Sequence, residues 1–199
     1  MTIAQETHYY SPEEYLEFEV NSELRHEYID GLIIPMTGGT PNHNQITGNF
    51  YAVLNFALKR QPYQVFVTDQ RLWIPKRRIH TYPDVMIVQT PLVFEEGRND
   101  TITNPVMIAE VLSKSTKGYD RDEKFAAYRT IASFQEYILI DQYTIHVEQY
   151  VKTDNRKWMF LEYEDINDTL NLTSVSCQIS LADIYDKVDF TSTESQLFV

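Results

Sequence analysis

The chain has 199 residues, of which 43% are hydrophobic and 23% are charged, and its formal net charge is −12. These values are typical of one ordinary domain with a sizeable core, and the negative charge counts against an extended phosphate-binding surface, because affinity for nucleic acid comes mainly from Lys and Arg. The single cysteine, Cys177, excludes an internal disulfide and a cysteine zinc cage, and no apolar run approaches the roughly 20 residues that cross a bilayer. Met1–Glu6 lacks a signal-peptide pattern, so we expect a cytoplasmic location and no membrane partner.

The first sixty residues predict two helices separated by a β-hairpin. Ser11–Glu14 predicts a helix start, because Ser can cap, Pro fits the first turn and Glu14 completes a capping box. Asp30-Gly31 between two apolar stretches indicates a hairpin turn, which puts Glu27 at the entry to the first strand. The spacing of apolar residues then predicts a helix from about 42 to 60.

The middle of the chain predicts a strand–helix–strand unit. Short strands are expected at 65–67 and 71–74, a further strand at 82–88, and a strand buried on both faces at 106–112. A helix from about 120 to 131 and a strand at 136–141 follow, and this order predicts parallel pairing with a right-handed crossover. An antiparallel pair is expected at 145–151 and 158–163. We expect one domain over residues 1–190, with a loose C-terminal tail at 191–199.

The buried strand at 106–112 contains one charged residue, Glu110. Side chains alternate along a strand, so Val106, Ile108, Glu110 and Leu112 are predicted to share a face. An ionised carboxylate there costs free energy unless a cation, a metal or hydrogen-bond donors compensate it. Glu110 by itself is explained at least equally well as a structural residue that is paired with an Arg or capped by backbone amides, and Asp84 by itself would cap a turn.

Five separated blocks of this sequence, in order, resemble the Uma-type endonucleases of the PD-(D/E)xK nuclease superfamily. The blocks are residues 25–31, 82–85, 109–116, 119–128 and 135–141, within a likeness that covers roughly 11 to 150. The resemblance implies an α/β, restriction-endonuclease-like fold with a mixed β-sheet core flanked by helices. It also implies an endonuclease that hydrolyses phosphodiester bonds of DNA with Mg²⁺, or Mn²⁺, as its cofactor. The fold analogy is also compatible with a homodimer, since cutting both strands of a duplex needs two sites.

The resemblance assigns the metal to Asp84, Glu110 and the backbone carbonyl of Val111. Mg²⁺ prefers oxygen ligands and keeps several waters, and it lowers the pKa of an attacking water. A lysine near that water would stabilise the developing negative charge. In the superfamily this lysine stands two residues after the glutamate, and that position is Leu112 here.

A lysine from the following helix is the expected replacement. Lys124 matches the family block, and the spacing of Asp120, Lys124 and Tyr128 puts them on one helix stripe. We predict that the Lys124 ammonium lies within roughly 6 Å of a carboxylate oxygen of Asp84 or Glu110, where it would act on the water. Lys114, in the loop after the strand, is the rival candidate.

Five further residues are candidates for the site, and two of them, Glu27 and His43, also have a plainer interpretation. Glu27 is either a catalytic residue or a solvated carboxylate. Lys114, Lys117 and Arg121 follow the central strand, and we expect them to bind nucleic acid on the same side as the carboxylates. His43 could contact a phosphate or the metal's water, but an exposed residue in the first turn of its helix is the favoured interpretation.

Two alternatives to a DNA endonuclease stay open on the sequence. Leu112 and the net charge favour a degenerate nuclease fold that binds nucleic acid or a protein partner without cutting. A hydrolase of a smaller phosphate ester would need a deep, closed cleft, whereas a duplex needs an open groove. Specificity for a DNA sequence, or for DNA over RNA, does not follow from these residues.

Overall fold

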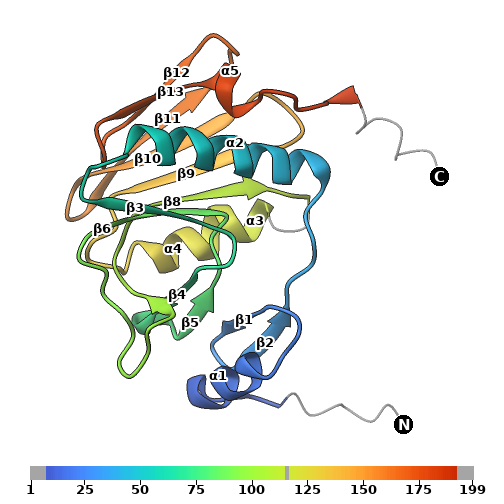
Figure 1. The fold of residues 1–199 in the computed structure, drawn as a ribbon, viewed down its shortest axis with the longest axis vertical. Helices are drawn as coiled ribbons and strands as arrows, with labels where there is room; N and C mark the ends of the chain where they lie inside the picture. Colours follow the sequence, from blue (N-terminus) through green and yellow to red (C-terminus); the bar gives the residue numbers. More distant parts are fainter. Residues whose placement is uncertain (1–7, 115–116, 192–199) are drawn as a thin grey trace.

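A computed structural model describes residues 8–114 and 117–191 of the protein (Figure 1). Its helices are α1 (Pro12–Val20), α2 (Pro41–Ala57), η1 (Pro75–Arg77), α3 (Lys117–Tyr119), η2 (Asp120–Lys124), α4 (Phe125–Tyr128) and α5 (Leu181–Ile184). Its strands are β1 (His26–Ile29), β2 (Leu32–Pro35), β3 (Tyr63–Val67), β4 (Arg71–Ile74), β5 (Ile79–Thr81), β6 (Val85–Gln89), β7 (Thr101–Ile102), β8 (Pro105–Leu112), β9 (Glu136–Asp141), β10 (Val147–Asp154), β11 (Lys157–Tyr163), β12 (Thr169–Leu172) and β13 (Cys177–Ser180).

The core is a six-stranded mixed sheet in the order β11-β10-β9-β8-β6-β3. Strands β8 and β9 pair in parallel, as the strand–helix–strand order predicts, and the other neighbours are antiparallel. All eight residues of β8 are buried, which matches its nearly unbroken apolar sequence. The expected α/β architecture with a mixed central sheet is therefore confirmed.

Helices cover both faces of this sheet (Figure 1). On one face, Ile46, Phe50 and Leu54 of α2 pack against alternate residues of β6 and β8. On the opposite face, the run α3–η2–α4 packs against the sheet through Tyr128 and Ala127. The acidic residues Asp84 and Glu110 lie between the two helical layers, at the start of β6 and near the end of β8.

A bulge in β8 overturns part of the predicted alternation. The register with β6 pairs Met107 with Ile87 but Pro105 with Val88, so Val106 is an extra residue. Val106 consequently packs on the α2 face, whereas Ile108 and Leu112 pack on the α4 face. The predicted common face is wrong for Val106 and correct for the other apolar residues.

A second sheet, in the order β2-β1-β5-β4-β7, supports the N-terminal hairpin. Asp30 and Gly31 form the predicted turn with φ of 43° and 102°. Strand β5 was not predicted, and the strand expected from Tyr82 begins only at Val85. The reason is that residues 82–84 carry the chain from this sheet to the central one and lie outside the strands of both.

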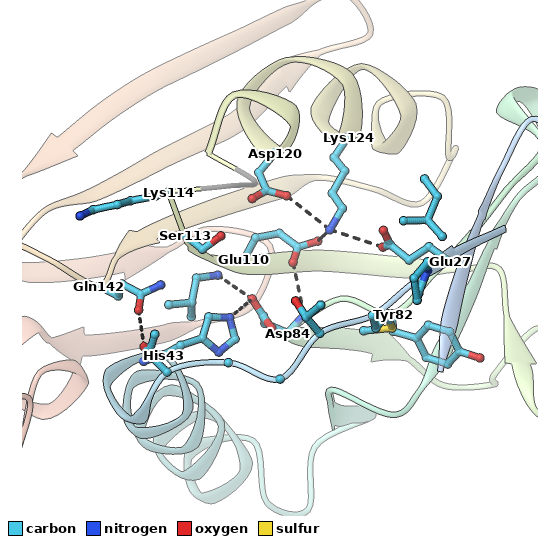
Figure 2. A pocket seen from close by; sticks show the side chains of 18 of the residues that line it. Glu27, His43, Tyr82, Asp84, Glu110, Ser113, Lys114, Asp120, Lys124 and Gln142 are labelled. Atoms are coloured by element: carbon cyan, nitrogen blue, oxygen red, sulfur yellow. Dashed lines mark hydrogen bonds and ion pairs between the residues drawn. The ribbon is translucent and has the colours of Figure 1, made fainter. Parts of the chain in front are cut away.

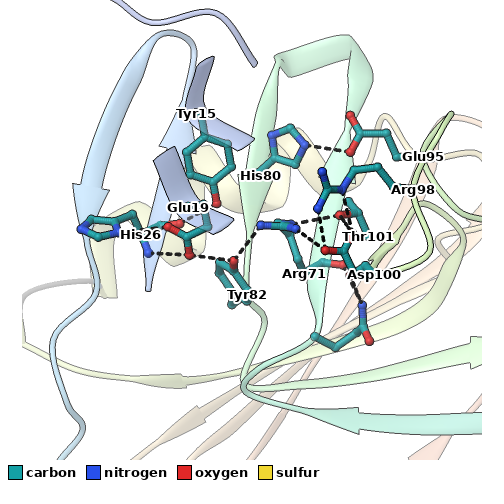
Figure 3. A network of polar contacts seen from close by, with 11 residues as sticks. Tyr15, Glu19, His26, Arg71, His80, Tyr82, Glu95, Arg98, Asp100 and Thr101 are labelled. Atoms are coloured by element: carbon teal, nitrogen blue, oxygen red, sulfur yellow. Dashed lines mark hydrogen bonds and ion pairs between the residues drawn. The ribbon is translucent and has the colours of Figure 1, made fainter. Parts of the chain in front are cut away.

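A buried polar network ties the second sheet to that crossing segment (Figure 3). The Tyr82 hydroxyl donates to Glu19 Oε1 (2.9 Å) and accepts from Arg71 Nη1 (3.3 Å). Glu19 also accepts from the backbone N–H of His26 (3.1 Å), and Arg71 Nη2 donates to Asp100 (2.8 Å). The network thereby fixes β1, which carries Glu27, relative to the segment that ends in Asp84.

None of the helices in the described part of the chain is long and apolar enough to span a membrane. The short helix α5 follows Ser180, whose hydroxyl accepts from the Ala182 N–H (3.1 Å). Residues 192–199, where most of the predicted loose tail falls, lie outside the described residues.

Candidate active site

The predicted acidic residues and lysines gather around one cavity of about 460 Å³ (Figure 2). Glu27 comes from β1, Asp84 from the segment before β6, Glu110 from β8 and Lys124 from the end of η2. The loop from β2 to α2 forms another wall. Glu27 and Lys124, which are 97 positions apart in the chain, are thus brought within ion-pair distance.

Asp84 and Glu110 lie side by side because β6 and β8 are antiparallel neighbours, with Val85 opposite Ala109. Each carboxylate accepts from backbone near the other: the Val111 N–H donates to Asp84 Oδ2 (2.7 Å) and the Asp84 N–H to Glu110 Oε2 (3.4 Å). His43 of α2 contacts Asp84, whereas Lys124 and Tyr128 from the helical run on the other face contact Glu110, so the convergence of the two carboxylates on one cation stays a prediction.

The Lys124 ammonium lies among three carboxylates. Its Nζ is 3.2 Å from Glu110 Oε1, 3.3 Å from Asp120 Oδ1 and 3.6 Å from Glu27 Oε1. The prediction was that the ammonium lies within roughly 6 Å of a carboxylate oxygen of Asp84 or Glu110. The distance to Glu110 Oε1 meets it. The helix adopts π-helical geometry over Asp120–Lys124, a local form that is frequent at functional sites.

Tyr128 completes the predicted helix stripe. Its hydroxyl donates to Glu110 Oε1 (2.6 Å), the same oxygen that accepts from the Lys124 ammonium.

Glu27 accepts a hydrogen bond from the Thr81 hydroxyl. Glu27 is therefore held in the cavity and is not a solvated carboxylate at a strand entry.

Negative charge exceeds positive charge in this cavity. Glu27, Asp84, Glu110 and Asp120 line it, against the two lysines Lys114 and Lys124 and one histidine. Burial raises the pKa of Glu110 to about 8, with the charges of Asp84 and Asp120 adding to the effect and Lys124 opposing it. Burial also opposes the charge of Lys124, but Glu110, Glu27 and Asp120 outweigh it and raise the pKa of this ammonium well above its usual value.

The donor set fits a hard divalent cation. Asp84 and Glu110 offer neighbouring carboxylate oxygens, and a divalent charge would offset the excess of carboxylates. Within residues 8–114 and 117–191, no three ligand-type side chains converge on one point, so water would have to supply further ligands, as it commonly does for Mg²⁺. Val111 contributes its N–H to Asp84, and its carbonyl as a ligand stays a prediction.

His43 was the residue that the sequence interpretation misplaced. Its side chain is 17% exposed, and its Nε2 lies 3.2 Å from Asp84 Oδ2. The favoured interpretation as an exposed first-turn residue is therefore wrong. A signal was present: His43 precedes Thr47, Phe50 and Leu54 at helical spacing, and all three are buried on α2.

The three predicted nucleic-acid contacts do not form one group. Lys114 lines the cavity. Arg121 instead donates from Nε to Glu148 Oε1 (2.9 Å), and the Lys117 ammonium is 3.5 Å from Asp141 Oδ2. Of the three, only Lys114 is placed to meet a ligand in this cavity.

The fold of this chain has a counterpart among solved structures. It is similar to a crystal structure described as a "putative nuclease belonging to DUF820" from Anabaena variabilis, with a TM-score of 0.72 and 19% identity, covering 88% of this chain and 97% of that one. The family follows from the sequence: residues 12–182 match the Uma2 family, described as "Putative restriction endonuclease". The chain belongs to the Uma2 family, as its five blocks indicated.

Two relatives come from Synechocystis sp. The "Uncharacterized protein sll1609" is 40% identical over 162 residues, which cover 81% of this chain and 92% of the relative. The "Uncharacterized protein slr1290" is 32% identical over 180 residues, which cover 90% and 93% of the two chains. Both likenesses extend over nearly the whole of the relative.

Proposed function

We propose that the protein is a divalent-metal-dependent endonuclease that hydrolyses phosphodiester bonds of DNA, with Mg²⁺ or Mn²⁺ as the cofactor. The observation that carries this proposal is the Lys124 ammonium 3.2 Å from Glu110, beside Asp84, in a cavity with excess negative charge. Family and fold support the same reaction class.

Each residue has a defined part in the proposed reaction. A bound cation would neutralise the phosphate and lower the pKa of the attacking water. Asp84 and Glu110 would hold that cation, and Lys124 would stabilise the negative charge that develops on the phosphate and the nucleophile. Tyr128 fixes Glu110 through its hydroxyl, while Asp120 and Glu27 orient the ammonium.

The position of Leu112 favours a working site over a degenerate one. Leu112 is 1% exposed and packs against the α4 face of the sheet. The position where the superfamily has its lysine is thus occupied by a core residue, Leu112. The helical run that covers this face places the Lys124 ammonium beside Glu110 instead. A chain that had lost the reaction would have no need to keep a buried lysine among three carboxylates, because burying these charges costs free energy.

Plasmid cleavage tests the proposed function. We expect the wild type to nick and linearise supercoiled DNA with Mg²⁺ or Mn²⁺, to stop when EDTA is added, and to lose this activity in the Asp84→Asn variant. The asparagine carbonyl can still accept from the Val111 N–H, so the fold should persist. DNA binding with metal binding but no cleavage under any of these conditions would establish the non-cutting alternative.

Lys114 is expected to contribute a phosphate contact that Arg121 does not. In the Asp84→Asn background, Lys114→Ala should weaken DNA binding and lower the slope of log K against log salt by about 1. Arg121→Ala should change that slope little, because its guanidinium is engaged by Glu148. Fluorescence anisotropy of a labelled duplex at several salt concentrations measures both. Equal slopes for Lys114→Ala and the parent would show that the DNA backbone does not reach Lys114.

A further inference from the structure

Lys114 differs from the other cations that follow β8 in the partner of its ammonium. Lys117, Arg121 and Lys124 each lie within ion-pair distance of a carboxylate. Among the described residues, the Lys114 ammonium has no carboxylate partner, and it lies 5.4 Å from the centroid of the Tyr143 ring. An aromatic ring at this distance attracts the cation without neutralising it. Lys114 therefore keeps its full charge for a ligand in the cavity.

Tyr143 brings a second hydrogen-bond donor to the wall that Lys114 lines. The Tyr143 hydroxyl oxygen accepts from the backbone N–H of Lys114 (3.3 Å). A phenol hydroxyl can accept and donate at the same time, so its proton is left to donate. Within residues 8–114 and 117–191, no acceptor lies within hydrogen-bond distance of this O–H. The two side chains thus present an ammonium and a hydroxyl together.

The turn after β9 holds Tyr143 in this place. Asp141, the last residue of β9, is buried, and its Oδ1 accepts from the Tyr143 N–H (2.7 Å). The Gln142 side chain donates to the Leu112 carbonyl (2.8 Å), which ties the turn to the end of β8. Lys114 lies only two residues beyond Leu112, so the turn and the loop keep the two donors at a fixed spacing.

We propose that Lys114 and Tyr143 form a subsite for a second phosphate of the DNA strand, one that is not cleaved. The inference rests on the proposed function, which assigns the cleaved phosphate to Asp84, Glu110 and Lys124. Figure 2 shows Lys114 extending away from Lys124, on the other flank of the acidic pair, so the two ammonium groups face different parts of a bound strand. Ammonium and hydroxyl groups are both common donors to phosphate oxygens. The substrate is therefore a chain with at least two phosphates, and not a small ester with one.

DNA binding in the Asp84→Asn background tests the hydroxyl of Tyr143. Tyr143→Phe keeps the ring beside Lys114 and should weaken binding by about 10-fold, because a hydrogen bond to a charged group is among the stronger ones. It should leave the slope of log K against log salt unchanged, since a neutral donor releases no counterion. The loss should persist in the Lys114→Ala background. The matched control is Tyr163→Phe, which removes a hydroxyl that donates to Gln149 (2.7 Å) outside the cavity.

A diester with a single phosphate, bis(p-nitrophenyl) phosphate, separates the subsite from the reaction. With Asp84 intact, we compare kcat/KM for DNA with kcat/KM for this diester. The ratio should fall about 10-fold in Tyr143→Phe and in Lys114→Ala, mainly through a higher KM for DNA, because a phosphate that does not react is bound equally in the ground and transition states. A role for Tyr143 in shaping the loop alone would lower both values together.

Three results would overturn the proposal. They are an unchanged ratio of the two kcat/KM values, parental DNA affinity in Tyr143→Phe, and no further loss when Tyr143→Phe is added to Lys114→Ala, which would mean that Tyr143 only positions the lysine. Failure of the wild type to bind or cut DNA would overturn the proposed function together with this inference, and so differs from all three.

Discussion

Replacing Lys124 with methionine should abolish DNA cleavage while metal binding persists. The ammonium is 3.2 Å from Glu110 Oε1, and without it Glu110 would still accept from the Tyr128 hydroxyl and the Asp84 N–H. Removal of one donor to a developing oxyanion costs about 10²–10³ in rate, and a lysine that also orients the water should cost at least as much. Single-turnover cleavage and Mn²⁺ calorimetry on the same preparation separate the two effects.

The same substitution should destabilise the metal-free protein at neutral pH. Methionine fills a similar volume, but Glu110, Glu27 and Asp120 lose the cation that they share. Removing one partner of a buried ion pair costs about 3–5 kcal/mol. The loss should shrink as the pH falls below about 8, because protonated Glu110 no longer needs the ammonium. Urea unfolding at pH 5 and pH 8 measures this change, and a bound divalent cation should restore part of the stability.

Lys117→Met is the matched control for Lys124. Lys117 lies on the same helical run, pairs with Asp141 at 3.5 Å and has a side chain that is 52% exposed. Its substitution should change the free energy of unfolding by less than about 1 kcal/mol, since exposed ion pairs contribute little. Cleavage at the wild-type rate by Lys124→Met would show that Lys124 takes no part in the reaction, and Lys114 would then be the lysine to test.

Glu110→Gln should stabilise the metal-free protein and abolish metal binding and cleavage. Burial raises the pKa of Glu110 to about 8, above its ordinary value of 4.5. The folded state therefore binds this proton more tightly than the unfolded state does, and the wild type loses stability as the pH rises from about 4.5 to 8. The glutamine variant carries no such charge. Its free energy of unfolding at pH 8 should exceed that of the wild type by on the order of 2 kcal/mol.

Unfolding by urea in EDTA at several pH values tests this sign. The advantage of Glu110→Gln should grow between pH 5 and pH 8 and then level off. Glu136→Gln is the contrasting control, because Glu136 is also fully buried but accepts from the N–H groups of Thr173 (3.1 Å) and Ser174 (2.9 Å) and from the Gln149 amide. Its substitution should lower stability. A lower free energy of unfolding for Glu110→Gln as well would mean that the Glu110–Lys124 pair is a structural salt bridge.

Local signals in the sequence were enough for much of the central fold. The Ser11–Glu14 capping box forms as predicted, with both reciprocal hydrogen bonds present. The apolar run around Glu110 becomes the buried strand β8, parallel to β9. The helix stripe carries Lys124 and Tyr128 to Glu110. Capping, burial and helical spacing depend on residues close in the chain, so they can be read without knowing the tertiary structure.

Three of the short strands, unlike β4 at Arg71–Ile74, could not be read in this way. Strands β5, β12 and β13 have three or four residues each, too few to show a period of two. Their strand conformation depends on partners: β5 lies between β1 and β4, while β12 and β13 pair with each other. The bulge at Val106 likewise follows from register with β6, which no pattern within β8 specifies.

By itself, the sequence determined the family and singled out the acidic pair Asp84 and Glu110, and it favoured Lys124 over Lys114 as the lysine beside them. Only the tertiary structure decided which other charged groups join them. Arg121 follows the central strand but turns to Glu148, which lies 27 residues further along the chain, and His43 turns inward to Asp84. A long polar side chain reaches several neighbours from one backbone position, and the partner it takes depends on which strands and helices the packed core brings within hydrogen-bond distance.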